Sequence, residues 1–182
     1  MNRQSAKCVT VLFALSAMCM IAFTAATVWA QDKQKYAFKP PPGSAKYTQQ
    51  TMIDVGDVPG HQVRLLELHS VFPGDAPVFD GVKEKEGWLR AFSDYTDANG
   101  HIFGYTVAIM ENGDKIFGRI EGVTQTTVGA DGSKTTRTVS TNTLTGGTGK
   151  FKGIRGTLRG IAATDFKNLS ENGTEGEYWI EK

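Results

Sequence analysis

Cysteine is almost absent from this sequence of 182 residues, and both of its cysteines stand near the N-terminus. Cys8 and Cys19 fall within residues 1–30, which have the pattern of a signal peptide. If that segment is removed, the remaining chain has no disulfide, no thiol nucleophile and no cysteine-ligated metal. Its stability would then depend on the packing of a hydrophobic core.

The N-terminal segment combines basic residues, a long apolar run and a cleavage motif. Two basic residues precede the apolar residues 9–28, and Val28-Trp29-Ala30 places small residues where signal peptidase requires them. A transmembrane anchor is the alternative, because the run is nearly long enough to span a bilayer and carries no charge. The cleavage motif and the polar residues 31–33 favour a signal peptide that ends at Ala30. We therefore expect a secreted or periplasmic protein without a membrane span after cleavage.

The sequence also lacks an excess of either charge. Lys and Arg number 20 against 19 Asp and Glu, so the formal net charge at pH 7 is +1. Such a balance creates no basic field for nucleic acid or anionic lipid, and we expect no nucleic-acid partner. The histidines His61, His69 and His101 have no metal-ligand spacing, so we expect no metal site and no cofactor.

Helical periodicity is missing, whereas turn signals recur at short intervals. Glycine next to Asn, Asp or Pro suits tight hairpin turns, as in Asn99-Gly100 and Asn112-Gly113. Between such turns lie runs rich in β-branched and aromatic residues, which are typical of strands. We predict eight strands, at about residues 50–55, 62–71, 87–97, 101–111, 115–128, 134–145, 156–166 and 174–181.

Consecutive strands joined by short turns form a meander, which removes its exposed edges most simply by closing into a barrel. We therefore predict an all-β fold, an eight-stranded antiparallel up-and-down barrel, over residues 50–182. A two-sheet sandwich is the alternative. Residues 31–49 contain Pro40-Pro41-Pro42 and no apolar periodicity, which predicts an extended linker or arm.

A glycine-rich segment, residues 146–156, is the least ordinary part of the chain. It is not a phosphate-binding loop, because Lys150 is followed by Phe151 rather than by Ser or Thr, and Leu144 stands where that motif needs its first glycine. We expect the glycines to shape a wide turn, under which Phe151 packs and plugs one end of the barrel.

The same segment resembles a known family. Gly146-Gly147-Thr148-Gly149-Lys150-Phe151-Lys152-Gly153-Ile154-Arg155-Gly156 is similar to the signature of the allene oxide cyclase-like and dirigent-like barrels, and residues 113–122 resemble the strand that precedes it there. The resemblance implies an eight-stranded antiparallel barrel with a pocket at one mouth, usually exported and often multimeric. The plant cyclases close an epoxide-bearing fatty acid, and dirigent proteins steer coupling or ring closure of phenolic intermediates. No catalytic residue of either family can be matched to a position here.

Strand alternation places residues two apart on one face of a strand. One such face carries Glu67, and another carries Arg119 with Glu121. If these faces point inward, the buried charges must be paired, and they become candidates for a site. The predicted ligand-binding residues are Glu67, Trp88, Tyr105, Phe117, Arg119 and Glu121. In the alternative, the charges face solvent and the barrel is filled from the opposite faces, by Leu66, Leu68, Ile116 and Ile120.

Three functions remain open at this point. The first is a binding protein that holds a small apolar or aromatic ligand in the barrel mouth, because a barrel of this size holds one small ligand. The second is an isomerase, cyclase or dirigent-like protein that steers ring closure or coupling of a reactive substrate. The third is a non-catalytic structural or assembly module, whose exterior makes a homo-oligomer.

Overall fold

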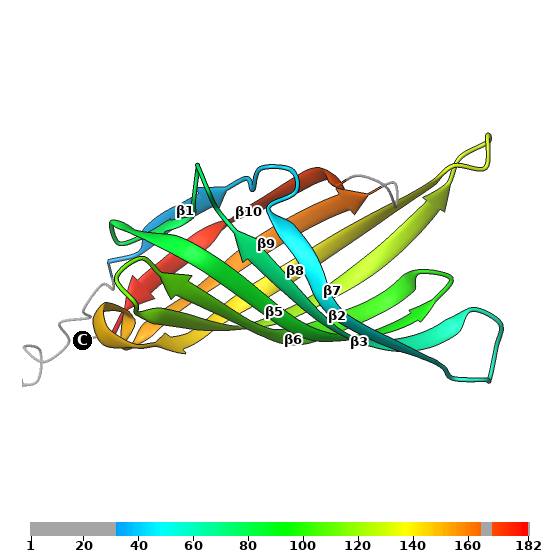
Figure 1. The fold of residues 1–182 in the computed structure, drawn as a ribbon, viewed down its shortest axis with the longest axis horizontal. Helices are drawn as coiled ribbons and strands as arrows, with labels where there is room; N and C mark the ends of the chain where they lie inside the picture. Colours follow the sequence, from blue (N-terminus) through cyan, green and yellow to red (C-terminus); the bar gives the residue numbers. More distant parts are fainter. Residues whose placement is uncertain (1–31, 165–168, 182) are drawn as a thin grey trace, which may run out of the picture. The chain divides into compact units, whose positions relative to one another are not determined.

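The computed structural model describes residues 32–164 and 169–181, and Figure 1 shows their path. The signal peptide predicted at residues 1–30 lies outside the described residues. The described part is all β apart from a single 3-10 turn, η1 (Gly149–Phe151). Its strands are β1 (Gln34–Phe38), β2 (Ala45–Asp54), β3 (His61–Val71), β4 (Val78–Phe79), β5 (Val82–Thr96), β6 (Asn99–Met110), β7 (Lys115–Val128), β8 (Lys134–Gly147), β9 (Ile154–Thr164) and β10 (Leu169–Ile180).

The strands form an antiparallel sheet in the order β1-β10-β9-β8-β7-β6-β5-β3-β2, with β4 paired to β5 off this path. Strands that follow one another along the chain are neighbours in most of the sheet, which confirms the predicted antiparallel meander. The sheet curls, as Figure 1 shows, and β1 and β2 are its two ends. Within the described residues no ladder joins β1 to β2.

The sheet has ten strands rather than the predicted eight, because β1 and β4 are additional. β1 lies in the segment expected to be an extended arm, where it pairs with β10 from Gln34 opposite Tyr178 to Phe38 opposite Thr174. β1 is short and is followed closely by prolines, so its sequence shows no recognisable strand pattern. β2 begins at Ala45, five residues before the predicted start, and both of its faces are largely exposed.

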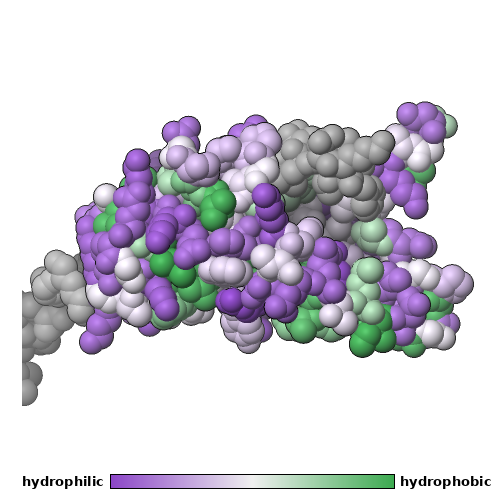
Figure 2. Space-filling model, viewed as in Figure 1, coloured by the Kyte–Doolittle hydropathy of each residue, from purple (hydrophilic) through white to green (hydrophobic). Residues whose placement is uncertain are grey.

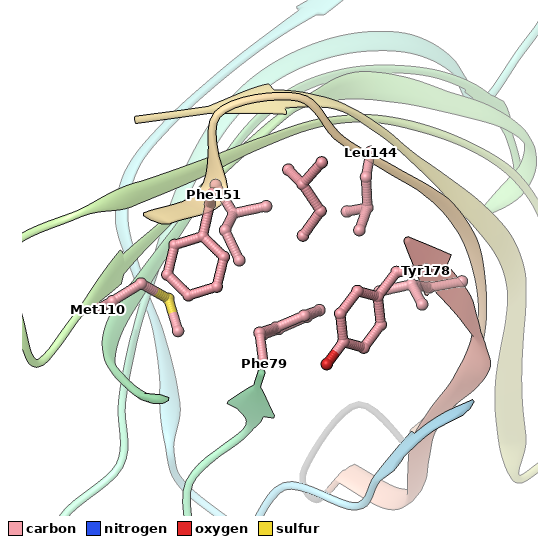
Figure 3. Close-up of a cluster of buried hydrophobic side chains, with 8 residues drawn as sticks. Phe79, Met110, Leu144, Phe151 and Tyr178 are labelled. Carbon is pink, nitrogen blue, oxygen red and sulfur yellow. The ribbon is translucent and has the colours of Figure 1, made fainter. Parts of the chain in front are cut away.

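A hydrophobic cluster fills one end of the curled sheet. Figure 3 shows its side chains pointing toward one another from the surrounding strands. The buried members are Phe79, Met110, Ile116, Leu144, Phe151, Ile154, Leu158 and Tyr178. Phe79 packs edge-on against Tyr178, with 5.2 Å between ring centroids. Since the Tyr178 hydroxyl donates to Gln34 Oε1 (2.7 Å) and accepts from the Asp80 backbone N–H (2.7 Å), β1 and β4 are both tied to β10.

Phe151 is 0% exposed, which confirms the predicted burial of this residue. The turn above it is held by the Phe151 N–H donating to the Thr148 carbonyl (2.9 Å) and by the Lys150 N–H donating to Asp114 Oδ2 (3.0 Å). Gly149 adopts φ +50° and has the Asp114 carboxylate against its Cα, where a Cβ would collide with it. The left-handed φ therefore favours glycine at this position, and any larger residue would also displace the Asp114 carboxylate.

Candidate functional site

The predicted site residues lie mainly on the outer face of the sheet. The side chains of Arg119 and Glu121 are 59% and 64% exposed, whereas Ile116 on the same strand is buried and Ile120 borders the interior cavity. Leu66 is buried in the same way beside Glu67. The structure thus corrects the expectation for these faces. The charges stand outside because the opposite faces carry enough large aliphatic side chains to fill the interior.

The outer-face charges are satisfied by one another. Glu67 accepts hydrogen bonds from Thr48 Oγ1 (2.7 Å) and Arg90 Nε (2.8 Å), and the Thr48 bond is the main reason that the pKa of Glu67 is lowered. Arg119 Nε lies 3.2 Å from Glu121 Oε1. Exposed ion pairs of this kind contribute little to stability.

The aromatic members of the predicted set also border the outer surface. Tyr105 is 64% exposed, and the half-buried Phe117 alternates with the buried Ile116. The Trp88 indole stacks on the ring of His69 with 4.0 Å between centroids. Of the six predicted residues, Trp88 alone also borders the interior cavity.

A shallow outer groove of about 640 Å³ contains Arg119 and Glu121, together with Phe103, Val123 and Val139. None of its charged groups is desolvated, since Arg119 and Glu121 are both exposed. We therefore regard the interior cavity as the stronger candidate site.

The interior cavity has a volume of about 410 Å³ and lies within the curl of the sheet. Both end strands line it, β1 with Tyr36 and Phe38 and β2 with Ala45 and Tyr47. The rest of its wall is mostly apolar, with a minority of hydroxyl and amide groups. Further lining residues are Leu68, Leu89, Ile102, Thr106, Ala108, Ile116, Ile120, Ser140, Asn142 and Leu158. A mainly apolar cavity of this size with few polar groups is typical of small-molecule sites.

Glu84 is the acidic residue in the cavity wall. The Glu84 carboxyl lies over Gly87, so close that a Cβ at position 87 would be 2.5 Å from Oε1. This carboxyl forms no hydrogen bond with any described residue. Desolvation raises the pKa of Glu84 to about 8. Burial, and then the nearby Glu84 charge, also raise the pKa of Tyr36. At neutral pH Glu84 is therefore mainly a neutral acid, which can donate a hydrogen bond into the cavity.

A β-bulge directs Glu84 inward. The register of β5 against β6 shifts between Glu84, opposite Met110, and Glu86, opposite Ile109. The bulge turns two carboxyl groups that are two residues apart to opposite faces. Glu84 lines the cavity, whereas Glu86 Oε2 binds His69 Nε2 (2.7 Å) on the outer face.

Hydroxyl and amide groups form a hydrogen-bonded stripe along the inner face of β7 and its neighbours. Thr106 Oγ1 donates to Asn142 Oδ1 (3.2 Å), in a space that a Cβ at Gly118 would fill. The Thr124 hydroxyl shares hydrogen bonds with Tyr95 (2.8 Å) and Thr138 (2.9 Å). Because these groups are paired with one another, Glu84 is distinguished from them by having no partner.

His61 bridges two aspartates at the end of the sheet where β3 begins. Its Nδ1 lies 2.6 Å from Asp57 Oδ1, and its Nε2 lies 2.8 Å from Asp94 Oδ1. The hydrogen bond to Asp94, followed by that to Asp57, raises the pKa of His61. Across residues 32–164 and 169–181, no group of histidine and acidic residues has the arrangement of a metal site.

Strand alternation alone does not reveal Glu84. Val82, Glu84 and Glu86 are spaced two residues apart, so alternation would put all three on one face of the strand. Only the bulge places the two carboxylates on opposite faces. No strand is predicted between residues 71 and 87, yet this segment contains both β4 and the start of β5.

No helix in the part of the chain that the structure describes is long and apolar enough to cross a membrane. The chain matches no known protein family, no curated protein and no solved structure. The resemblance to allene oxide cyclase-like and dirigent-like barrels therefore stays a prediction.

Proposed function

We propose that this domain is an exported protein that binds a small, largely apolar molecule in its interior cavity, with Glu84 as the polar anchor. The observation that carries the proposal is a carboxyl group without a partner in an apolar wall. Leaving such a group unpaired has a cost, which a ligand with a hydrogen-bond acceptor offsets. The ligand class is a small apolar or aromatic molecule with a carbonyl, ether or hydroxyl oxygen.

The proposal includes the closed form of the fold. We propose that the curled sheet works as a β-barrel, with β1 and β2 at its seam. The lining of one cavity by both end strands supports this, as does the contact of Phe38 on β1 with Phe72 after β3, whose ring centroids are 5.6 Å apart.

The test compares two tryptophan variants on one strand. Ile120→Trp fills the cavity from the inner face of β7, and Val123→Trp adds the same bulk on the exposed outer face. By isothermal titration calorimetry with 1-naphthol and 1-decanol as probes, we expect Ile120→Trp to bind at least tenfold more weakly than the parent. Val123→Trp should bind like the parent. Equal binding by both variants, or no binding by the parent, would contradict the proposal.

A positioned acid with a raised pKa is also what general acid catalysis requires, so an isomerase or cyclase activity is a second candidate. Glu84 would be its proton donor. Turnover of a bound substrate that is lost in Glu84→Gln, while binding persists, would distinguish catalysis from binding.

An assembly role is a third candidate, favoured by the apolar outer face. Figure 2 shows hydrophobic residues reaching the surface between hydrophilic ones. Leu65 on β3 and Phe103 and Tyr105 on β6 are exposed on the two sides of β5. Val123, Val139 and Ile161 continue the patch in one cross-strand row. A second copy of this chain is the proposed occupant, because Arg119 and Glu121 border the patch and can pair reciprocally across a two-fold axis.

A further inference from the structure

Arg64 is an arginine that projects from the inner face of β3. It stands opposite Met52 of β2 and Ser93 of β5. Its Nη1 donates to the neutral amide oxygen Oε1 of Gln50 (3.2 Å), and its guanidinium lies 5.6 Å from the centre of the Tyr47 ring. Its Nε is buried and has no hydrogen-bond acceptor.

No ion pair compensates the charge of Arg64 within the described residues. Three other arginines are paired with carboxylates: Arg90 with Glu67, Arg119 with Glu121, and Arg155 with Glu181. The hydroxyl of Ser93, directly opposite Arg64, is fully buried and also has no partner. Hydrogen-bonding capacity is therefore unmet at this place, and a half-buried cation without a counter-charge is costly.

The position of Arg64 links it to the interior cavity. Tyr47, over which its guanidinium lies, lines the cavity. Tyr47 is 52% exposed and Met52 is 59% exposed, so the inner face of β2 is accessible to solvent. A ligand that passes β2 would meet Arg64 first and could then extend its apolar part into the cavity.

Glu84 and Arg64 stand far apart along the cavity axis. Glu84 and Ser93, which faces Arg64, are both on β5, and at about 3.3 Å per residue their backbones are roughly 25–30 Å apart. The interior thus has an acid near the hydrophobic plug and a cation toward the other end, with apolar wall between them.

We infer that Arg64 forms an anion subsite for an elongated ligand that has an apolar body and one anionic head. This inference rests on the proposed function, since it assumes that the apolar body occupies the interior cavity. The head is a carboxylate or a sulfate, which the planar guanidinium binds with charge-assisted hydrogen bonds. Tyr47 and Gln50 position the guanidinium from β2.

The test uses probes that differ in the head group alone. Calorimetric titration with decanoate, decyl sulfate and 1-decanol is carried out on the parent, on Arg64→Met and on the control Arg90→Met. Arg90 is an outer-face arginine, so its loss leaves the interior unchanged. We expect Arg64→Met to weaken binding of both anions at least tenfold and to leave binding of 1-decanol unchanged. Arg90→Met should bind all three probes like the parent.

Arg64→Lys serves as the second variant. It keeps the charge and should retain more anion binding than Arg64→Met, with folding of each variant checked by urea denaturation. If anion binding is the same in the parent and in folded Arg64→Met, or falls equally in Arg64→Lys and Arg64→Met, the subsite is overturned while the proposed function stands. If no probe binds the parent, or if Ile120→Trp binds 1-decanol like the parent, the proposed function fails as well.

Discussion

At the scale of single residues, the chemistry of the interior is concentrated in two side chains, Glu84 and Arg64. Most of the other polar groups on the inner faces pair with one another, as Thr124 does with Tyr95 and Thr138. The Glu84 carboxyl has no partner and a raised pKa, whereas Arg64 has as its hydrogen-bond partner the neutral amide of Gln50. An unpaired group in a cavity wall lowers stability in the free protein and is therefore a reasonable sign of a binding site.

Glu84 makes stability dependent on pH. In the unfolded chain its carboxyl loses its proton near the ordinary pKa of 4.5, whereas in the folded protein it holds the proton to about pH 8. The unfolded state therefore binds fewer protons in this window, and the free energy of unfolding falls as pH rises from about 4.5 to 8, by on the order of 4 kcal/mol. Glu84→Gln should lose this part of the pH dependence.

The measurement is urea denaturation at pH 5 and at pH 8.5 for the parent, Glu84→Gln and the exposed control Glu121→Gln. His61 changes stability in the same direction, because its raised pKa means that its contribution is present below 6.5 and is lost at higher pH. The difference between parent and Glu84→Gln isolates the effect of Glu84. A pH dependence that is identical in these two proteins would show that Glu84 is not desolvated.

At the scale of elements, the connection from β8 through η1 to β9 closes one end of the sheet. Glycines 147, 149, 153 and 156 lie so close to neighbouring atoms that an added Cβ would collide. This close approach lets the turn fold over the core, and Phe151 joins the buried cluster that also contains Met110 and Ile154. The turn is thus structural, and the core beneath it borders the cavity through Ile116, Leu144 and Leu158.

Phe151→Ala should reduce the free energy of unfolding by about 3–5 kcal/mol, as is usual for deletion of a fully buried aromatic side chain. The control is Phe103→Ala, which removes a ring that is 48% exposed, and we expect it to cost about 1 kcal/mol or less. Chemical denaturation of the three proteins measures both values. Similar losses in the two variants would argue against Phe151 as the plug.

At the scale of the whole molecule, the curled sheet divides its residues into an interior set and an exterior set. The interior has the plug, the cavity, the unpaired acid Glu84 and the cation Arg64, and the exterior has ion pairs interleaved with exposed apolar residues. Apolar side chains that continue across several neighbouring strands are unusual on a monomer and mark contact surfaces.

Self-association through the outer face is tested by Phe103→Glu, which places a charge in the middle of the patch. We expect sedimentation velocity to show a concentration-dependent dimer for the parent and a monomer for this variant. The control Val128→Glu changes an exposed apolar residue at the end of β7, outside the patch, and should associate like the parent. A parent that stays monomeric at high concentration would remove the assembly role and leave the cavity proposal intact.

The sequence by itself determined the class of the fold. Turn signals and the β-branched runs between them predicted the eight longest strands and their antiparallel order, because these signals are local. The predicted turn at Asn99-Gly100 is wrong in detail, since the hairpin turn is made by Asp97 and Ala98 at positive φ and Asn99 already begins β6. Local signals did not reveal β1, which is a strand only because β10 pairs with it. The burial of Phe151 was also predictable, since a large aromatic residue among glycines has few places to pack.

Only the tertiary structure decided which face of each strand points inward. On β3 and β7 both faces carry apolar residues, so alternation allows either Arg119 or Ile120 inside, and the curl of the whole sheet selects the aliphatic side. The inward turn of Glu84 depends on the bulge between β5 and β6, which is a property of two paired strands. Register and curvature arise from pairing over the whole sheet. A site built from side chains on several strands therefore cannot be predicted from the sequence of any single strand.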